Sequence, residues 1–356
     1  MTPEATSSSN SRNLNQNMLT VRRNLNLNNQ TTDLDQYDVL PPGMLDIDIE
    51  RSLKDPNYDA TYAKSIEYMR RERESQCIIH DPDFIFDDKS KFKNGARIKL
   101  SKMTLTLHQR SAIVDWLIQL AVSELDMCNT SIFLTVQILD LIVTRLSMDE
   151  DYLALVGLVS LMIAGKVEEI CPPNPELLVK LTGNVYTIES LVVTEQDILK
   201  LLEWKVILPT RYQFMDRMQS AGQMNPRAVL LSNFIIEVSL QDFNLNQYAP
   251  SRIAAAAIHL ARQMLMPLNA EIWTPMLQYY TTYDEQSLIP VIERLNSAYW
   301  NMVTTPERKH PSYCRYNSPQ RQHVARVTAL RPSELRFDLN NDNNNNNNKN
   351  YFIRLS

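Results

Sequence analysis

The sequence predicts an all-α protein built from two related sets of helices. Only 6 glycines occur in 356 residues, and the Asn-Gly and Asp-Gly pairs that favour the tight turns of β-hairpins are scarce. Hydrophobic residues make up 44% of the chain and recur at the spacing of amphipathic helices. A chain of this length and apolar content can bury the cores of two domains.

The two ends of the chain have a different composition. Residues 1–45 are rich in Ser, Asn, Thr and Gln and contain no aromatic residue before Tyr37, so we expect a disordered regulatory tail. Residues 336–356 form a second low-complexity tail, which includes an Asn-rich run. Residues 55–106 are expected to hold an amphipathic helix followed by a long polar connection.

Helical periodicity then predicts two sets of five helices with a junction at Pro209, because proline lacks the backbone N–H that a helix interior needs. We expect a first domain at 107–208 and a second at 209–335. The expected helices of the first domain lie near 108–123, 130–146, 152–170, 174–181 and 187–203. Those of the second lie near 210–220, 226–240, 248–266, 271–281 and 284–303.

The two sets are related through their central helices. The segment LVGLVSLMIAGK, from Leu155, aligns without gaps with RIAAAAIHLARQ, from Arg252. Both segments are rich in small residues, which let neighbouring helices approach closely: Gly, Ser and Ala in the first and Ala in the second. The simplest architecture is therefore a duplicated five-helix unit with a buried central helix.

The end of the first central helix differs from its counterpart. Lys166 aligns with Gln263, and the acidic pair Glu168–Glu169 aligns with an apolar pair, Leu265–Met266. Carboxylates in the last turn of a helix are disfavoured by the helix dipole by about 0.3–1 kcal/mol each. A charged ending that is present in one copy only, and that helix stability does not require, indicates a functional surface.

Two further charged residues interrupt apolar helix faces in the first set. Arg110 lies among the apolar residues of the first helix, and Asp140 lies within VQILDLIV of the second. A buried guanidinium needs a partner, and a carboxylate can accept two parallel hydrogen bonds from it. We expect Arg110 and Asp140 to form a structural ion pair.

Several classes of function find no support in the sequence. There is no nucleophile–base pair, phosphate-binding loop or metal-ligand spacing, so we expect neither an enzyme nor a bound metal or cofactor. Four of the five net negative charges lie in the first 50 residues, so the rest of the chain is near neutral and has little attraction to nucleic acid. We expect no membrane segment and no signal peptide. Four isolated cysteines are typical of a reducing compartment: Cys77, Cys128, Cys171 and Cys314.

Specific motifs in both sets resemble the cyclin family. RSAIVDWL at 110–117 is similar to the first-helix signature of the cyclin box, and AGKVEEICPP at 164–173 is similar to the end of its third helix. Glu195 stands where the fifth helix of the family carries a glutamate. Residues 272–296 resemble B-type mitotic cyclins in particular, and the resemblance extends over about 55–335.

The resemblance implies a non-catalytic subunit that binds and activates a mitotic cyclin-dependent kinase, in the nucleus and cytoplasm, at G2/M. Lys166 and Glu195 would bond main-chain groups of the kinase's regulatory helix, and Glu168 and Glu169 would lie near the same edge, facing the basic activation-loop region. The expected kinase-binding residues are Lys166, Val167, Glu168, Glu169, Glu195, Leu199 and Trp204.

The chain departs from the family at the patch where many A- and B-type cyclins dock Arg-x-Leu motifs of substrates. Gln109 and Ala112 replace a methionine and a larger aliphatic residue, and Gln119 replaces an acid. We therefore expect weak or altered docking. The residues of this degenerate docking patch are Gln109, Ile113, Trp116, Gln119 and Leu153.

Short regulatory patterns are also present. Arg22 and Leu25 match a destruction box of mitotic cyclins, which implies the ubiquitin ligase of mitotic exit as a second partner. Thr305 and Ser318 each precede a proline with a basic residue two positions further on, which is the pattern of proline-directed kinase substrates.

Two other readings of the tandem helical units remain. A IIB-type transcription factor shares the duplicated five-helix architecture but would need a zinc ribbon and a basic surface, and a salt-dependent DNA-binding assay would reveal it. The other is a helical adaptor that activates no kinase, in which the presence of Lys166 and Glu195 would be incidental.

Overall fold

In a computed structural model, residues 40, 46–55, 59–79, 106–146, 148–304 and 310–337 can be described, and these contain helices, turns and no β-strand. The predicted all-α class is therefore confirmed for this part of the chain. The expected N-terminal tail and C-terminal low-complexity tail lie almost entirely outside the described residues, as does most of the expected polar connection.

The chain forms two compact units, residues 1–68 and 69–356. The first contains α2 (Ile47–Lys54), which begins where the side chain of Asp46 accepts a hydrogen bond from the backbone N–H of Asp48. This helix was not predicted. Helix α3 (Ala60–Glu74) begins in the first unit and ends in the second, and corresponds to the amphipathic helix expected after residue 55.

In the second unit, the first five-helix set predicted from the sequence forms a bundle. The bounds of its helices match the prediction within a few residues. Helix α5 starts at a capping box, in which the hydroxyl of Thr106 accepts the backbone N–H of Gln109. Its last turn widens into a π-helix. The elements are α5 (Leu107–Gln119), the π-helix (Leu120–Glu124), α6 (Asn129–Val143), α7 (Glu150–Glu168), α8 (Pro175–Leu181) and α9 (Ile188–Leu201).

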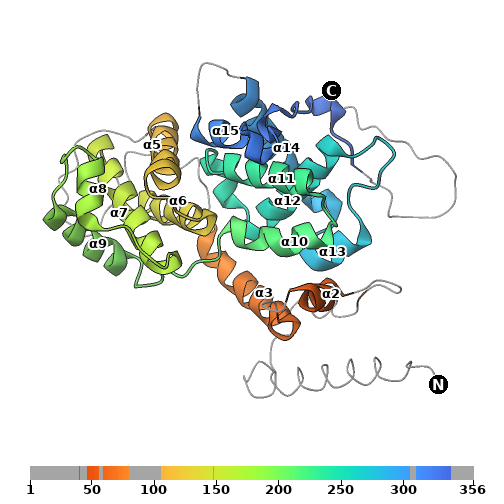
Figure 1. Ribbon diagram of the computed structural model, residues 1–356, viewed down its shortest axis with the longest axis horizontal. Helices are drawn as coiled ribbons and strands as arrows, with labels where there is room; N and C mark the ends of the chain where they lie inside the picture. Colours follow the sequence, from red (N-terminus) through yellow and green to blue (C-terminus); the bar gives the residue numbers. More distant parts are fainter. Residues whose placement is uncertain are drawn as a thin grey trace. The chain divides into compact units, whose positions relative to one another are not determined.

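Helix α7 is the buried centre of the first bundle and packs against α5, α6 and α9 (Figure 1). Gly157 sits where α5 crosses it. A Cβ atom at this position would lie 3.1 Å from the side chain of Leu117 and 3.2 Å from that of Ile113. The small residues of the central helix therefore permit the close approach that the sequence predicted.

The second bundle repeats this arrangement around α12, whose alanines from Ala254 to Ala257 are fully buried. Helix α12 packs against α10, α11 and α14. Three helices of this bundle have a proline in the first turn, where a backbone N–H would have no acceptor within the helix. The elements are α10 (Met215–Ala221), α11 (Pro226–Val238), α12 (Pro250–Leu265), α13 (Pro275–Thr281) and α14 (Glu285–Thr304).

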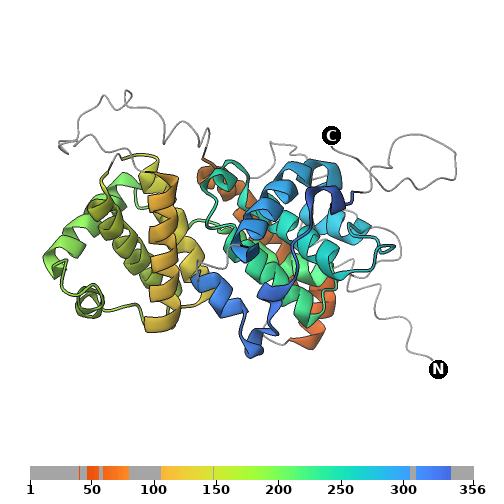
Figure 2. The same cartoon turned by 90° about the horizontal axis from the view of Figure 1, so that it is seen from above.

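A C-terminal segment, residues 310–337, follows the second bundle and begins with α15 (Pro311–Tyr316). This helix was not predicted. It packs against both α11 and α5, and Figure 2 shows it in blue beside the orange α5. The imidazole of His310 lies 2.7 Å from the carboxylate of Asp115 on α5. The C-terminal segment is thus hydrogen-bonded directly to α5, the first helix of the first domain.

Candidate partner-binding site

The charged ending of α7 meets α9 through an ion pair. The Nζ of Lys166 lies 2.5 Å from Oε1 of Glu195. The lysine side chain is 45% exposed and the glutamate side chain is 14% exposed, so the pair lies at the surface. Two residues predicted to bind one partner are therefore neighbours in space, although 29 positions separate them in the sequence.

Apolar residues lie close in sequence to both members of this pair. Val167 and Leu199 are half-buried, whereas the indole of Trp204 is 68% exposed. Leu199 lies one helical turn beyond Glu195 on the same face of α9. We define the partner-binding surface as Lys166, Val167, Glu195, Leu199 and Trp204.

The backbone at Trp204 is unusual. Glu203 and Trp204 have φ angles of 52° and 61°, in the left-handed region that bulky side chains rarely adopt. The backbone N–H of Trp204 donates to the carbonyl of Leu199, which ends α9. The chain thus accepts an unfavourable conformation that holds a large apolar side chain in water, a combination typical of functional sites.

Two exposed residues near this surface were missed in the sequence analysis. Ile170, just after α7, is fully exposed, and Ile207, between Trp204 and Pro209, is 72% exposed. Each lies two residues before a proline and outside any helix, so its apolar side chain has no helix face to fill. The sequence signal that could have identified these two residues was their position shortly before a proline.

Glu169 requires a correction, because its carboxylate is bound within the chain rather than turned to a partner. Its Oε1 accepts the backbone N–H of Cys128 at 2.7 Å and the hydroxyl of Ser131 at 2.5 Å. Both donors belong to the start of α6. The carboxylate that is disfavoured at the end of α7 is therefore favoured at the positive end of α6, where it acts as a capping residue from another helix.

The pKa of Glu169 reflects this role. Burial opposes its negative charge, but the hydrogen bonds from Ser131 and Cys128 outweigh that cost and lower the pKa below its usual value. A glutamate whose pKa is lowered by folding contributes stability above its unfolded pKa, about 4.3. That contribution is lost as the pH falls through the pKa of the folded state.

We therefore expect Glu169→Ala to lower the free energy of unfolding by about 1 kcal/mol at neutral pH, the usual value of a lost helix cap. Denaturant titrations of the variant and the parent protein should converge only below about pH 4.3. Glu124→Ala, which removes an exposed carboxylate from the end of the π-helix that follows α5, is the control and should change stability little. A Glu169→Ala protein as stable as the parent at pH 7 would contradict the capping role.

Glu168 is also turned partly towards its own chain. It is half-buried, and its Oε1 accepts a long hydrogen bond, 3.4 Å, from the side-chain amide of Gln213. Gln213 belongs to the 3-10 helix η4 (Arg211–Phe214) that opens the second domain. The expectation that both glutamates face a partner is therefore wrong for Glu169, whereas for Glu168 it stays a prediction.

Arg110 and Asp140 form the predicted ion pair in the interior. The guanidinium donates two parallel bonds of 2.8 Å to the carboxylate, and the two side chains are only 1% and 3% exposed. Arg110 also donates to the backbone carbonyl of Leu240 at 2.7 Å, and Asn246 donates to Asp140 at 2.7 Å. The pair therefore joins the two domains, a role that the sequence did not reveal.

The degenerate docking patch is only partly accessible. Gln109, Ile113 and Trp116 lie along one face of α5 and are half-buried, and Gln119 is exposed. Gln109 is held by Thr106 and by Glu150, to which its amide donates at 3.0 Å. Leu153 is completely buried, so its assignment to the docking surface is corrected: it is a core residue beneath the patch.

Other predicted features fall elsewhere. Arg22, Leu25 and Thr305 lie outside the described residues, whereas Ser318 lies within them. Within the described part of the chain, no three His, Cys, Asp or Glu side chains gather in a way that could bind a metal ion. The same part has no helix that is both long and apolar enough to cross a membrane.

The family model described as cyclin, N-terminal domain, matches residues 66–207, and that described as cyclin, C-terminal domain, matches residues 209–330. Both findings agree with the resemblance carried by the helix motifs. A viral cyclin structure from herpesvirus saimiri aligns with a TM-score of 0.49 and 19% identity over 55% of this chain and 85% of its own, which is too weak a similarity to support an argument.

Mitotic cyclins are among the most similar curated proteins. G2/mitotic-specific cyclin-B3 of Gallus gallus is 29% identical over 72% of this chain and 58% of its own. G2/mitotic-specific cyclin-B of Arbacia punctulata is 29% identical over 65% and 56%, and Cyclin-B1-2 of Arabidopsis thaliana is 31% identical over 62% and 48%. The chain thus spans about half the length of these three relatives.

Proposed function

Because this chain belongs to the cyclin family, we propose that it is a regulatory subunit that binds and activates a cyclin-dependent Ser/Thr kinase and acts at the entry into mitosis or meiosis. The names of its relatives, which are mitotic cyclins, support this timing. We also propose that it works in the nucleus and cytoplasm, and that a ubiquitin ligase of mitotic exit removes it.

The observation that carries the proposal is the partner-binding surface on α7 and α9. It combines a half-exposed ion pair, Lys166–Glu195, with the exposed indole of Trp204. Tryptophan is enriched among the residues that dominate the binding energy of a protein interface, and charged groups help to fix the register of a partner. Neither feature is explained by the stability of the chain itself.

This surface suits the regulatory helix of a protein kinase. That helix carries a glutamate that must pair with the active-site lysine before phosphoryl transfer can occur. Lys166 offers a donor and Glu195 an acceptor to main-chain groups of the helix, and Leu199 and Trp204 offer apolar contact. A partner that binds the active arrangement more tightly than the inactive one shifts the kinase towards activity.

The proposal is tested by purifying the full chain from native extracts. We expect mass spectrometry to identify a cyclin-dependent kinase in the purified complex, and the complex to phosphorylate a histone-type substrate. A helical adaptor would bring down partners without kinase activity, and a IIB-type factor would bind DNA in a salt-dependent way. Either result, with no kinase present, would overturn the proposal.

Trp204→Ala should weaken kinase binding by about 30-fold, the effect of losing a hot-spot contact of about 2 kcal/mol. Calorimetry or surface plasmon resonance with the purified kinase would measure the change. Trp300→Ala, which removes another exposed indole, on α14, is the matched control and should leave the Kd unchanged. Equal affinity of the Trp204→Ala and parent proteins would remove Trp204 from the interface.

A further inference from the structure

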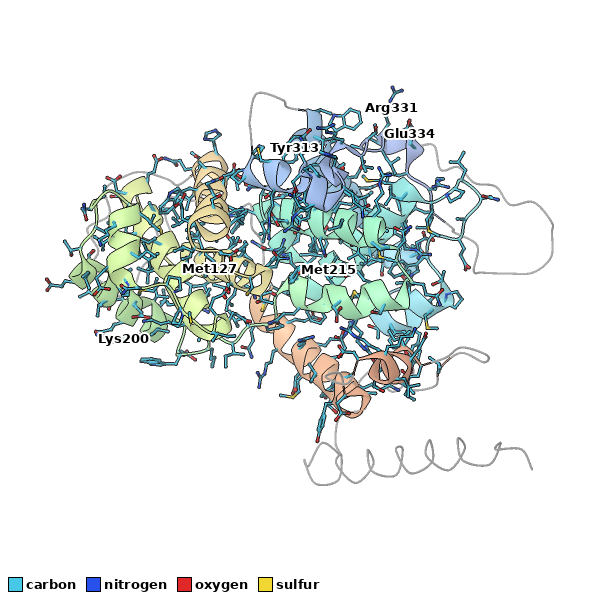
Figure 3. The ribbon with its side chains drawn as sticks, viewed as in Figure 1. Met127, Lys200, Met215, Tyr313, Arg331 and Glu334 are labelled. Atoms are coloured by element: carbon cyan, nitrogen blue, oxygen red, sulfur yellow. The ribbon has the colours of Figure 1, made fainter. Side chains whose placement is uncertain are left out.

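The C-terminal segment contains a pattern that the proposed kinase-binding function does not use. Ser318 is followed by Pro319 and then by Arg321, and it lies just after α15. We propose that Ser318 is a phosphorylation site for proline-directed Ser/Thr kinases, and that Arg321 and Arg326 bind the phosphate once it is attached. Figure 3 marks this segment by Tyr313 on α15 and by Arg331 near its end.

The backbone at Ser318 is suited to a phosphate acceptor. Its φ and ψ angles, −83° and 154°, are those of the extended chain that protein kinases bind. Its side chain is half-buried, and the hydroxyl makes one hydrogen bond, to the carbonyl of Arg315 at 3.0 Å. Pro319 has no backbone N–H, so a kinase pocket needs no acceptor for it.

The turn after Ser318 is short, and the carbonyl of Ser318 accepts the backbone N–H groups of Arg321 and His323, each at 3.1 Å. It is a single 3-10 turn, η6 (Pro319–Arg321), which ends in Gln322 and His323 with φ angles of 52° and 50°. L-residues rarely adopt this left-handed conformation, so releasing the turn relieves strain at two positions. A short, strained turn is easier to extend into a kinase groove than a regular helix.

The charge around Ser318 is entirely positive along the chain. Residues 310–326 contain no Asp or Glu. The guanidinium of Arg326 donates to the side chain of Asn317 at 2.7 Å, and that of Arg321 lies 4.6 Å from the centre of the Tyr316 ring. Both arginines are therefore held beside the residues that immediately precede Ser318.

The acidic groups that other helices turn towards this segment, Asp115 and Glu237, are bonded to His310 and Arg315 rather than to Arg321 or Arg326. Glu237 on α11 is 1% exposed and accepts a hydrogen bond of 2.7 Å from Arg315. Arg315 also donates to Asn129 on α6 at 2.7 Å. Arg321 and Arg326 make no such ion pair in the described residues, so they can bind a phosphate without breaking one.

The reaction is an ordinary phosphoryl transfer from ATP bound to the kinase. The Ser318 Oγ forms a bond to the γ-phosphorus while the bond from that phosphorus to the bridging oxygen breaks, and ADP leaves. The hydroxyl proton passes to the catalytic aspartate of the kinase. The product loses the hydrogen bond to Arg315 and gains a dianion that accepts bidentate bonds from arginine.

The first experiment phosphorylates the purified full chain with a proline-directed kinase that is active without a cyclin, so that its outcome is independent of the proposed function. We expect phosphopeptide mapping to find phosphate at Ser318, and Pro319→Ala to reduce the rate about tenfold through loss of one favourable contact in the transition state. Ser333, exposed in the same segment but followed by Glu334, is the internal control and should stay unmodified. Equal labelling of Ser318 and Ser333, or none at Ser318, would overturn the site.

A second experiment tests the arginines by phosphorus NMR of the modified chain. The second pKa of phosphoserine is about 6, and neighbouring guanidinium groups should lower it by about one unit. Arg326→Gln, eight residues from Ser318 and outside the kinase pattern, should raise that pKa back towards 6 without slowing phosphorylation. A phosphate that titrates identically in the parent and the variant would show that these arginines do not bind it.

Discussion

Replacing Arg110 with alanine should lower the free energy of unfolding by about 3–5 kcal/mol, the usual cost of removing one partner of a buried ion pair. The carboxylate of Asp140 would stay in an interior where it is 3% exposed, and would keep only the bond from Asn246. The backbone carbonyl of Leu240 would lose its donor as well. Chemical denaturation monitored by circular dichroism would measure the loss.

Two further variants make this test specific. Arg110→Met with Asp140→Leu removes both charges of the pair and should cost less than Arg110→Ala, because the Asp140 carboxylate is no longer buried without Arg110. Arg145→Ala, which removes an exposed arginine with one bond to a backbone carbonyl, should change stability by about 1 kcal/mol or less. If Arg110→Ala were no more harmful than Arg145→Ala, the pair would not stabilise the fold.

The second large effect is expected at the partner-binding surface. Lys166→Ala combined with Glu195→Ala should raise the Kd for the kinase by about 100-fold or more, because each charge-assisted hydrogen bond contributes about 1.5–3 kcal/mol. Stability should change by about 1 kcal/mol or less, since the pair is partly exposed to solvent. Binding assays with purified kinase, alongside helical content from circular dichroism, separate the two effects.

The chain offers a closely matched control. Lys200, labelled in Figure 3, and Asp197 form an exposed ion pair of 3.9 Å on α9. Asp197 follows Glu195 by two residues, which places the two on opposite faces of the helix. The double alanine variant of Lys200 and Asp197 removes the same charges and should bind normally. The exchange Lys166→Glu with Glu195→Lys keeps the internal pair but places each charge wrongly for a partner. Like the double alanine variant of Lys166 and Glu195, it should therefore fail to bind. Normal binding by that exchange variant would exclude these residues from the interface.

Much of the fold followed from periodicity and helix-stop signals. The apolar spacing of α7 and α12, and the prolines that end or begin their neighbours, located ten helices within a few residues. The pairing of Arg110 with Asp140 was predictable because a lone charge on an apolar face needs a partner in the same bundle. Periodicity and proline positions can be recognised within a short stretch of sequence, and the pairing of Arg110 has a single solution.

The remaining features depend on contacts that leave no local trace. Helices α2 and α15 contain 8 and 6 residues, which are too few to be stable without tertiary packing. The carbonyl of Leu240 that completes the Arg110 site is a backbone group, which every residue possesses. Glu169 reaches a helix start 41 positions away, and its type alone could not distinguish a cap from an outward charge.

The bond from Arg110 to Leu240, together with that from His310 to Asp115, has an evolutionary consequence. A duplicated unit begins as two copies that can each fold alone, and here each copy has come to depend on atoms supplied by the other. Loss of the second copy would leave the buried Nη1 of Arg110 without the carbonyl of Leu240, and Asp115 without His310. Once such bonds between the two domains have become fixed in evolution, the surfaces of the domains can still change. The two domains can no longer be separated, so they are inherited together as one structure.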